Sequence, residues 1–153
     1  MNAIRDTEAN IKSTTLARIL NKGAAQGAVL ALDAPLSFWG AFDPRTGLII
    51  DVHHPQKGKR LSGTILMMRE TRGSGTAPGG MAEALRLGTA PAAIILVKPD
   101  INLAIGALVA ETLYGRGCPI VSVGEADYRR LSRQRALAID AEGHITPLPR
   151  DAP

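Results

Sequence analysis

The chain has 153 residues, of which 45% are hydrophobic, 21% charged and 3% aromatic, and its formal net charge is +4 at pH 7. A chain of this length is expected to form one domain and to bury roughly two thirds of the surface that it exposes when unfolded. The basic residues are dispersed except for "HHPQKGKR" and "YRRLSRQR". Neither segment is interleaved with the aromatic rings on which single-stranded nucleic acids stack, so we expect no nucleic-acid partner.

The cysteine content and the N-terminal sequence bear on the cellular compartment. Cys118 is the only cysteine, so the chain has no internal disulfide and cannot by itself hold a cluster that needs three or four ligands. The segment "MNAIRDTEANIKSTT" has no apolar run typical of a signal peptide. The longest apolar stretches are shorter than the ~20 residues that span a membrane. We therefore expect a cytoplasmic protein with no membrane partner and no metal ligands of its own.

The N-terminal part is predicted to be an extension, residues 1–22, which precedes a folded domain over residues 23–153. Within the extension, "STTLARIL" predicts a short helix that begins at Ser13 or Thr14. The first element of the domain is a strand in "QGAVLALDAPL", which Pro35 ends.

Two turn signals follow. "FDPRTGLIID" predicts a β-hairpin, because Pro44 suits the first turn position and Gly47 suits a residue with positive φ. "LSGTILMMRE" predicts a strand, and a helix is expected over about residues 80–87 with Gly88 as its C-cap.

The next elements alternate between strand and helix. "PAAIILV" is typical of a strand that is covered on both faces. "DINLAIGALVAETLYG" predicts a helix capped by Asp100, in which Ile101, Ile105, Leu108 and Leu113 recur at the spacing of a core-facing stripe. "CPIVSVG" predicts another buried strand and "EADYRRLSR" a polar helix.

The order of the elements predicts the fold class. "ALAIDAEGHITPL" predicts a closing hairpin that turns at residues 140–143. Two successive strand–helix–strand units favour parallel strands with right-handed crossovers, whereas the hairpins favour an antiparallel or barrel-like portion. We expect an α/β domain with three layers, β/β/α, and flanking β-hairpins.

The segment "ETRGSGTAPGGMAEALRLG" joins the end of a strand to the start of a helix, the position at which α/β folds bind ligands and where free amides attract anions. Arg72 can hold a carboxylate or phosphate, Gly73 and Gly75 let the backbone approach a ligand, and Ser74 and Thr76 add hydroxyls. The glycine spacing matches neither common nucleotide-binding motif. An ordinary helix-capping turn fits the same pattern.

Several segments together resemble the small, swivelling domain of aconitase X. They are "LDAPLSFWGAFDPRTGLIIDVHHPQKGKRLSGTILMM", "RGSGT", "GTAPAAIIL" and "GALVAETLYG". The resemblance runs from about residue 23 to residue 123, and the order and spacing of SFWG, DP, TG, IID, HPQ and the following glycines are specific. It implies an aconitase swivel-like fold.

The resemblance also implies a dehydratase divided between two chains. A large subunit carries an iron–sulfur cluster and much of the substrate pocket, and the swivel domain closes over it and contributes a serine as the base. The matching residue is Ser74, with Arg72, Gly73, Gly75 and Thr76 as substrate-binding residues, and no cofactor is bound by this chain. Many relatives continue this loop with further serines, so only Thr76 is left for a second hydroxyl.

Two reactions of small hydroxy acids are implied. One removes the α-proton and the 3-hydroxyl of cis-3-hydroxy-L-proline and gives pyrroline-2-carboxylate after tautomerisation. The other converts mevalonate 5-phosphate to trans-anhydromevalonate 5-phosphate. We expect the first, because the loop departs from the serine-rich version that we associate with the phosphomevalonate branch. A non-catalytic interaction module of the same fold is the alternative, whereas a phosphohistidine carrier is disfavoured because residues 70–88 include no histidine.

A serine hydroxyl needs strong help to act as a base. Lowering its pKa by roughly six units requires about 8 kcal/mol of differential stabilisation. A helix N-terminus supplies roughly 0.3 to 2 kcal/mol, and a solvated Arg72 adds little. We therefore expect the isolated chain to be inert and to need closure against the large subunit.

Five other residues have simpler expected roles. Adjacent histidines point in different directions, so His53 and His54 are expected to be structural or interfacial and not metal ligands. Trp39 is expected to be a packing anchor, with a place at the subunit contact as the alternative. Asp43 and Asp51 are expected to cap turns.

Overall fold

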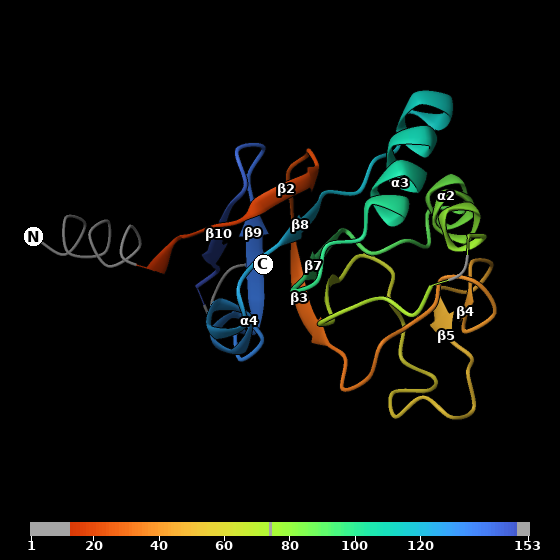
Figure 1. Ribbon diagram of the computed structural model, residues 1–153, viewed down its shortest axis with the longest axis horizontal. Helices are drawn as coiled ribbons and strands as arrows, with labels where there is room; N and C mark the ends of the chain where they lie inside the picture. Colours follow the sequence, from red (N-terminus) through yellow and green to blue (C-terminus); the bar gives the residue numbers. More distant parts are fainter. Residues whose placement is uncertain (1–12, 74, 150–153) are drawn as a thin grey trace, which may run out of the picture.

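The computed structural model describes residues 13–73 and 75–149. Within them, eight strands form one mixed sheet in the order β1-β10-β9-β3-β6-β7-β8-β2 (Figure 1). The strands are β1 (Thr15–Leu16), β2 (Arg18–Asn21), β3 (Ala25–Ala31), β6 (Ile65–Met67), β7 (Ala93–Leu96), β8 (Ile120–Ser122), β9 (Ala136–Ile139) and β10 (His144–Pro147).

The sheet is nearly closed by its first two strands. β1 and β2 are separated only by Ala17, yet they lie at opposite ends of the sheet. β1 pairs antiparallel with β10, and β2 pairs antiparallel with β8. The helix predicted in "STTLARIL" is therefore wrong, because the extended chain satisfies the free hydrogen-bonding groups of both sheet edges, which a helix cannot do.

The middle of the sheet follows the predicted strand–helix–strand order. β3, β6, β7 and β8 run parallel. The connection from β6 to β7 passes through α2 (Ala77–Leu87) and that from β7 to β8 through α3 (Ile101–Tyr114), while α4 (Glu125–Leu131) follows β8. The capping predictions are confirmed, since Gly88 ends α2 in the left-handed conformation and Asp100 accepts a hydrogen bond from the amide of Leu103 at 3.1 Å.

Both predicted hairpins are present. β4 (Phe42–Asp43) pairs antiparallel with β5 (Leu48–Ile49), and Gly47 has a φ of +75° in the turn between them. β9 and β10 form the closing hairpin, whose turn is held by a bond from the Gly143 amide to the Asp140 carbonyl at 3.1 Å. The predicted α/β fold with a β/β/α arrangement and flanking hairpins is confirmed.

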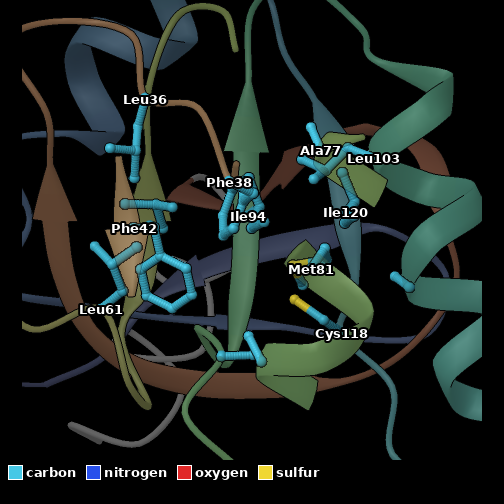
Figure 2. Packing of buried hydrophobic residues seen from close by; sticks show 14 of the residues in the cluster. Leu36, Phe38, Phe42, Leu61, Ala77, Met81, Ile94, Leu103, Cys118 and Ile120 are labelled. Atoms are coloured by element: carbon cyan, nitrogen blue, oxygen red, sulfur yellow. The ribbon is translucent and has the colours of Figure 1, made fainter. Parts of the chain in front are cut away.

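Alternate residues of the parallel strands enter two separate cores. On β6, Ile65 and Met67 face one cluster, which Tyr128 and Leu131 of α4 complete, whereas Leu66 faces the other. The second cluster lies between the sheet and the layer of α2 and α3 (Figure 2). Labelled members from outside the strands are Leu36, Phe38, Leu61, Ala77, Met81, Leu103 and Cys118.

The face of α3 that is buried differs from the predicted one. The sequence favoured Ile101, Ile105, Leu108 and Leu113 as the core-facing stripe, but all four are exposed. The buried residues are instead mostly small, namely Leu103, Ala104, Gly106, Ala107 and Ala110. The reason is the close approach of α2, since a Cβ on Gly106 would lie 2.6 Å from the Pro78 carbonyl oxygen. Large side chains do not fit between helices at this separation.

The structure describes only residues 13–22 of the predicted N-terminal extension. Residues 15–21 are strands of the same sheet as the rest of the domain. Residues 1–12 lie outside the described residues, and for them an N-terminal extension stays a prediction. None of the helices in the described part of the chain is long and apolar enough to cross a membrane.

Candidate functional site

The glycine-rich loop over residues 71–76 leads from β6 into α2. Its first residues are anchored on two sides. Thr71 forms an isolated parallel bridge with Leu36, and the amide of Arg72 donates to the Leu36 carbonyl at 3.2 Å. The Thr71 hydroxyl donates to the Asp100 carboxylate at 2.5 Å. The loop therefore leaves the core from a fixed point next to the N-terminus of α3.

The start of α2 is packed closely against its neighbours. Thr76 is the N-cap, and its carbonyl accepts hydrogen bonds from the amides of Gly79 and Gly80 at 3.0 and 3.4 Å. A Cβ on Gly80 would lie 2.0 Å from the Phe38 carbonyl oxygen. The first turn of α2 contains no acidic residue, so the positive end of the helix dipole is left for an anion.

The structure brings two of the predicted site residues together in one hollow. Arg72 and Gly73 line a concavity of about 400 Å³. Its other lining residues come from the chain before and after β4 and β5, namely Ser37, Trp39, Gly40, Ala41 and Asp51. Gly75 and Thr76 are exposed beside it. Ser74, the predicted catalytic residue, lies outside the described residues.

Trp39 is the main residue of this hollow whose role the sequence did not predict. It is 60% exposed, so the expected packing-anchor role is wrong, and the neighbouring Phe38 fills the core instead. Phe38 packs edge-on against Phe42 with ring centroids 5.4 Å apart. The signal is the alternation in "LSFW", in which Leu36 and Phe38 are buried while Trp39 is exposed in the turn over residues 38–40. Ser37 holds the bend through bonds with the Trp39 carbonyl and amide at 3.0 and 3.1 Å.

The two aspartates cap turns as predicted. The Asp43 carboxylate accepts from the amide of Arg45 at 3.0 Å, and this bond lowers the pKa of Asp43. The Asp51 carboxylate accepts from the amide of His53 at 2.9 Å.

His54 has a structural role, as expected. It is buried, its Nδ1 accepts from the amide of Gln56 at 3.0 Å, and its Nε2 lies 3.1 Å from the Ala34 carbonyl oxygen. Both ring nitrogens are therefore used when the ring is neutral and Nε2 carries the proton. His53 is exposed. Within residues 13–73 and 75–149, no three His, Cys, Asp or Glu side chains are grouped so that they could hold a metal ion.

An iron–sulfur cluster does not fit the described residues of this chain. Such clusters are held mainly by several cysteine thiolates. Cys118, the only cysteine in the sequence, is fully buried, and this burial raises the pKa of its thiol far above the usual range. The thiol points into the core between the sheet and α2 (Figure 2), so it behaves as a small apolar side chain.

A larger concavity of about 640 Å³ lies elsewhere, between residues 26–29 and residues 133–136. None of the predicted site residues lines it. Leu148 and Pro149 form part of its wall, and the chain continues from there into residues 150–153, which are outside the described residues. We therefore assign the candidate site to the smaller hollow, where the anchored loop and Arg72 lie.

A nearly closed mixed sheet, with an exposed loop that enters a helix beside it, is the architecture of a swivelling domain. The family model described as the aconitase X swivel domain matches residues 14–147. The chain belongs to this family.

Named relatives carry out two different reactions. The cis-3-hydroxy-L-proline dehydratase of Pseudomonas aeruginosa is 47% identical over 108 residues, which make up 71% of this chain and 19% of that protein. The phosphomevalonate dehydratase small subunit of Methanosarcina mazei is 34% identical over 130 residues, 84% of this chain and 86% of that one. This chain thus spans about a fifth of the length of the hydroxyproline dehydratases that it matches.

A solved structure shows the same fold. The crystal structure of Thermococcus kodakaraensis aconitase X in its holo-form is 26% identical and superposes with a TM-score of 0.74. The match covers 89% of this chain and 98% of that chain.

Proposed function

We propose that this chain is the small subunit of a two-chain hydro-lyase of the aconitase X type, and that its substrate is cis-3-hydroxy-L-proline. The substrate assignment is supported by the 47% identity to a cis-3-hydroxy-L-proline dehydratase, against 34% to a phosphomevalonate dehydratase small subunit. The two-chain assembly is supported by the match to a phosphomevalonate dehydratase small subunit, a separate chain of which the match covers 86%. The observation that carries the proposal is the anchored loop, whose Arg72 lines a hollow beside the exposed start of α2.

The proposed reaction is the loss of one water molecule. Ser74 takes the proton from C2 of the substrate, and the electron pair of that C–H bond forms a double bond between C2 and C3. The C3–O bond breaks and the hydroxyl leaves as hydroxide, which with the proton balances to water. The resulting enamine tautomerises to pyrroline-2-carboxylate. In this scheme Arg72 binds the substrate carboxylate, since a guanidinium group can hold both carboxylate oxygens.

The exposure of the loop supports the proposed need for a second chain. Arg72, Gly73, Gly75 and Thr76 are all exposed, so in the isolated chain water screens the positive charge and the helix dipole. These groups then supply far less than the about 8 kcal/mol that a serine base needs near neutral pH. A partner that covers the loop excludes water and strengthens each of these interactions. We place the iron–sulfur cluster in that partner, since this chain does not provide its ligands.

The experiment that tests the proposal is reconstitution with an aconitase X-type large subunit. The two-chain complex is expected to consume cis-3-hydroxy-L-proline, and this chain alone is expected to be inert. Ser74→Ala should abolish turnover while the complex still assembles on a sizing column. Ser132→Ala is the matched control, since it removes a serine hydroxyl at the end of α4, outside the candidate site. Near-normal turnover by the Ser74→Ala complex would remove this residue from the mechanism.

A second function has its own support. Curated phosphomevalonate dehydratase small subunits align with this chain over most of their own length, whereas the hydroxyproline dehydratases are much longer proteins. The same complex should therefore be assayed with mevalonate 5-phosphate. Turnover of that substrate alone would replace the substrate assignment. Turnover of neither, by a complex that assembles and carries its cluster, would favour a non-catalytic interaction module.

A further inference from the structure

The outer face of α3 carries an exposed apolar stripe, which consists of Ile101, Ile105, Leu108 and Val109. Their exposed fractions are 65%, 49%, 55% and 44%. At 100° per residue, these four positions lie within about a third of a turn of one another. They point away from the sheet, because the buried residues of α3 lie on the opposite side.

The distribution of apolar side chains on α3 is the reverse of that on a helix whose outer face is in water. Such a helix buries its large apolar side chains and shows charged ones to water. Here the buried side is made mostly of alanine and glycine, and the exposed side is apolar. Of the 14 residues of α3, all in the described part of the chain, Glu111 alone is charged. Contiguous apolar surface of this kind marks an interaction site.

The stripe begins at the candidate site. Ile101 directly follows Asp100, whose carboxylate holds Thr71 at the start of the glycine-rich loop. Gly106, about one and a half turns further along α3, packs on Pro78 in the first turn of α2. Trp39, 60% exposed, lines the hollow that Arg72 and Gly73 share. A partner that covers the loop therefore contacts the first turns of α3.

The relatives indicate what that partner is. In the hydroxyproline dehydratase of P. aeruginosa the matching segment is 19% of a longer chain, so there the domain has four fifths of a polypeptide beside it. In M. mazei the match is to a separate small subunit. A second copy of this chain would not explain why the stripe starts at the site, since the second copy repeats the same loop and supplies no other part of the pocket.

We infer that the α3 stripe is the docking surface for the large subunit, and that the contact seats this subunit over the loop at residues 71–76. The inference rests on the two-chain assembly proposed above. The partner surface is an uncharged apolar groove, because the stripe offers no charge for pairing and each buried apolar side chain contributes by leaving water. The Asp100 contact joins α3 to the loop, and the Gly106 contact joins α3 to α2. A partner that docks on α3 therefore has a fixed position relative to the loop.

The test measures binding and not turnover. A purified aconitase X-type large subunit is titrated with wild-type chain, with Ile105→Glu/Leu108→Glu and with Ile105→Ala/Leu108→Ala. Two carboxylates buried without partners should weaken binding at least about 100-fold, and the alanine pair about tenfold. All variants should melt within a few degrees of the wild type, because the changed side chains face water in the isolated chain.

Leu16→Glu is the matched control. Leu16 is 69% exposed on β1, which lies at the other end of the molecule from α3 (Figure 1). This variant should bind as the wild type does.

Each outcome decides a separate point. Wild-type affinity in the glutamate variant would overturn the inference, whatever the turnover of the complex. Self-association of the wild type that the glutamate variant abolishes, with unchanged binding of the large subunit, would assign the stripe to a second copy and also overturn it. If the variants lose binding but the wild-type complex consumes neither substrate, the docking surface stands and the proposed function fails.

Discussion

The hydroxyl of Thr71 and the carboxylate of Asp100 are joined by a 2.5 Å hydrogen bond. The same carboxylate caps α3 through the amide of Leu103 at 3.1 Å. One side chain thus holds both the start of the glycine-rich loop and the start of the helix beside it. The direction in which the loop leaves the core is consequently set by α3 as well as by β6.

Two substitutions separate the contributions of these two bonds to the free energy of unfolding. Thr71→Val removes the hydroxyl at constant shape and is expected to lower the free energy of unfolding by about 1 to 2 kcal/mol, because the bond is to a charged group. Asp100→Ala removes both bonds and should cost more, since the loss of a helix cap adds roughly 0.5 to 2 kcal/mol. Denaturant unfolding of both variants checks this order. Equal stability of Asp100→Ala and the wild type would show that neither bond matters.

Two adjacent glycines in the first turns of α2 should respond in opposite ways to alanine. Gly80→Ala is expected to destabilise the domain by about 1 to 3 kcal/mol, because its Cβ meets the Phe38 carbonyl oxygen at 2.0 Å and the helix must move. Gly79→Ala meets nothing within 4 Å and should stabilise the helix by up to about 1 kcal/mol. Thermal unfolding of the pair measures the difference. A similar effect of both substitutions would contradict the close packing of α2 on the Phe38 segment.

Glu125 should make the stability depend on pH in the acid range. Its pKa is lowered, mainly by the hydrogen bond from Arg69 and further by Arg129. A carboxylate with a lowered folded-state pKa stabilises the protein above its unfolded pKa, roughly 4.3, and this contribution is lost as the pH falls through the folded value. Glu125→Gln should therefore be less stable than the wild type at pH 7, and the gap should shrink as the pH falls below about 4.3.

The measurement is urea unfolding of both proteins at several pH values. Glu142→Gln serves as the control, because it removes one carboxylate from the exposed turn between β9 and β10. A gap between Glu125→Gln and the wild type that stays constant from pH 7 to pH 3 would assign the effect to something other than this charge.

Tyr128 is a core residue whose hydroxyl is not needed for packing. The side chain is buried, and within the described residues its hydroxyl oxygen has no hydrogen-bond partner. Burial also raises the pKa of Tyr128. Tyr128→Phe keeps the ring under the Arg69 guanidinium, 4.8 Å from the ring centroid. It should stabilise the domain by about 1 kcal/mol or more, because an unsatisfied buried hydroxyl is costly.

Tyr128→Ala is the contrasting variant. It is expected to cost about 3 to 5 kcal/mol, because it leaves a cavity in the cluster that Tyr128 shares with Ile65 and Met67. The free energies of unfolding of both variants provide the check. A marked loss of stability in Tyr128→Phe would show that the hydroxyl has a partner after all, such as a buried water molecule.

The elements that the sequence predicted correctly depend on local chemistry. Pro44 and Gly47 define the turn of the β4–β5 hairpin, Gly88 and Asp100 are caps, and the apolar run of β7 is buried on both faces. Each of these features is determined within a few residues, so the pattern alone indicates it. The family resemblance likewise depends on motifs read along the chain, and the match over residues 14–147 confirms it.

The sequence by itself therefore determined the turns, the caps, the parallel strand–helix order and the family. Only the tertiary structure decided that residues 15–21 are strands, that Trp39 faces the hollow, and that α3 buries its small residues and exposes its large ones. These three features share a physical reason. Each is set by a neighbour that is distant in sequence: β8 and β10 for the closing strands, Arg72 and Gly73 for Trp39, and Pro78 for Gly106. Periodicity along the chain reports which side chains are apolar, but the approach of another element decides which of them it can cover.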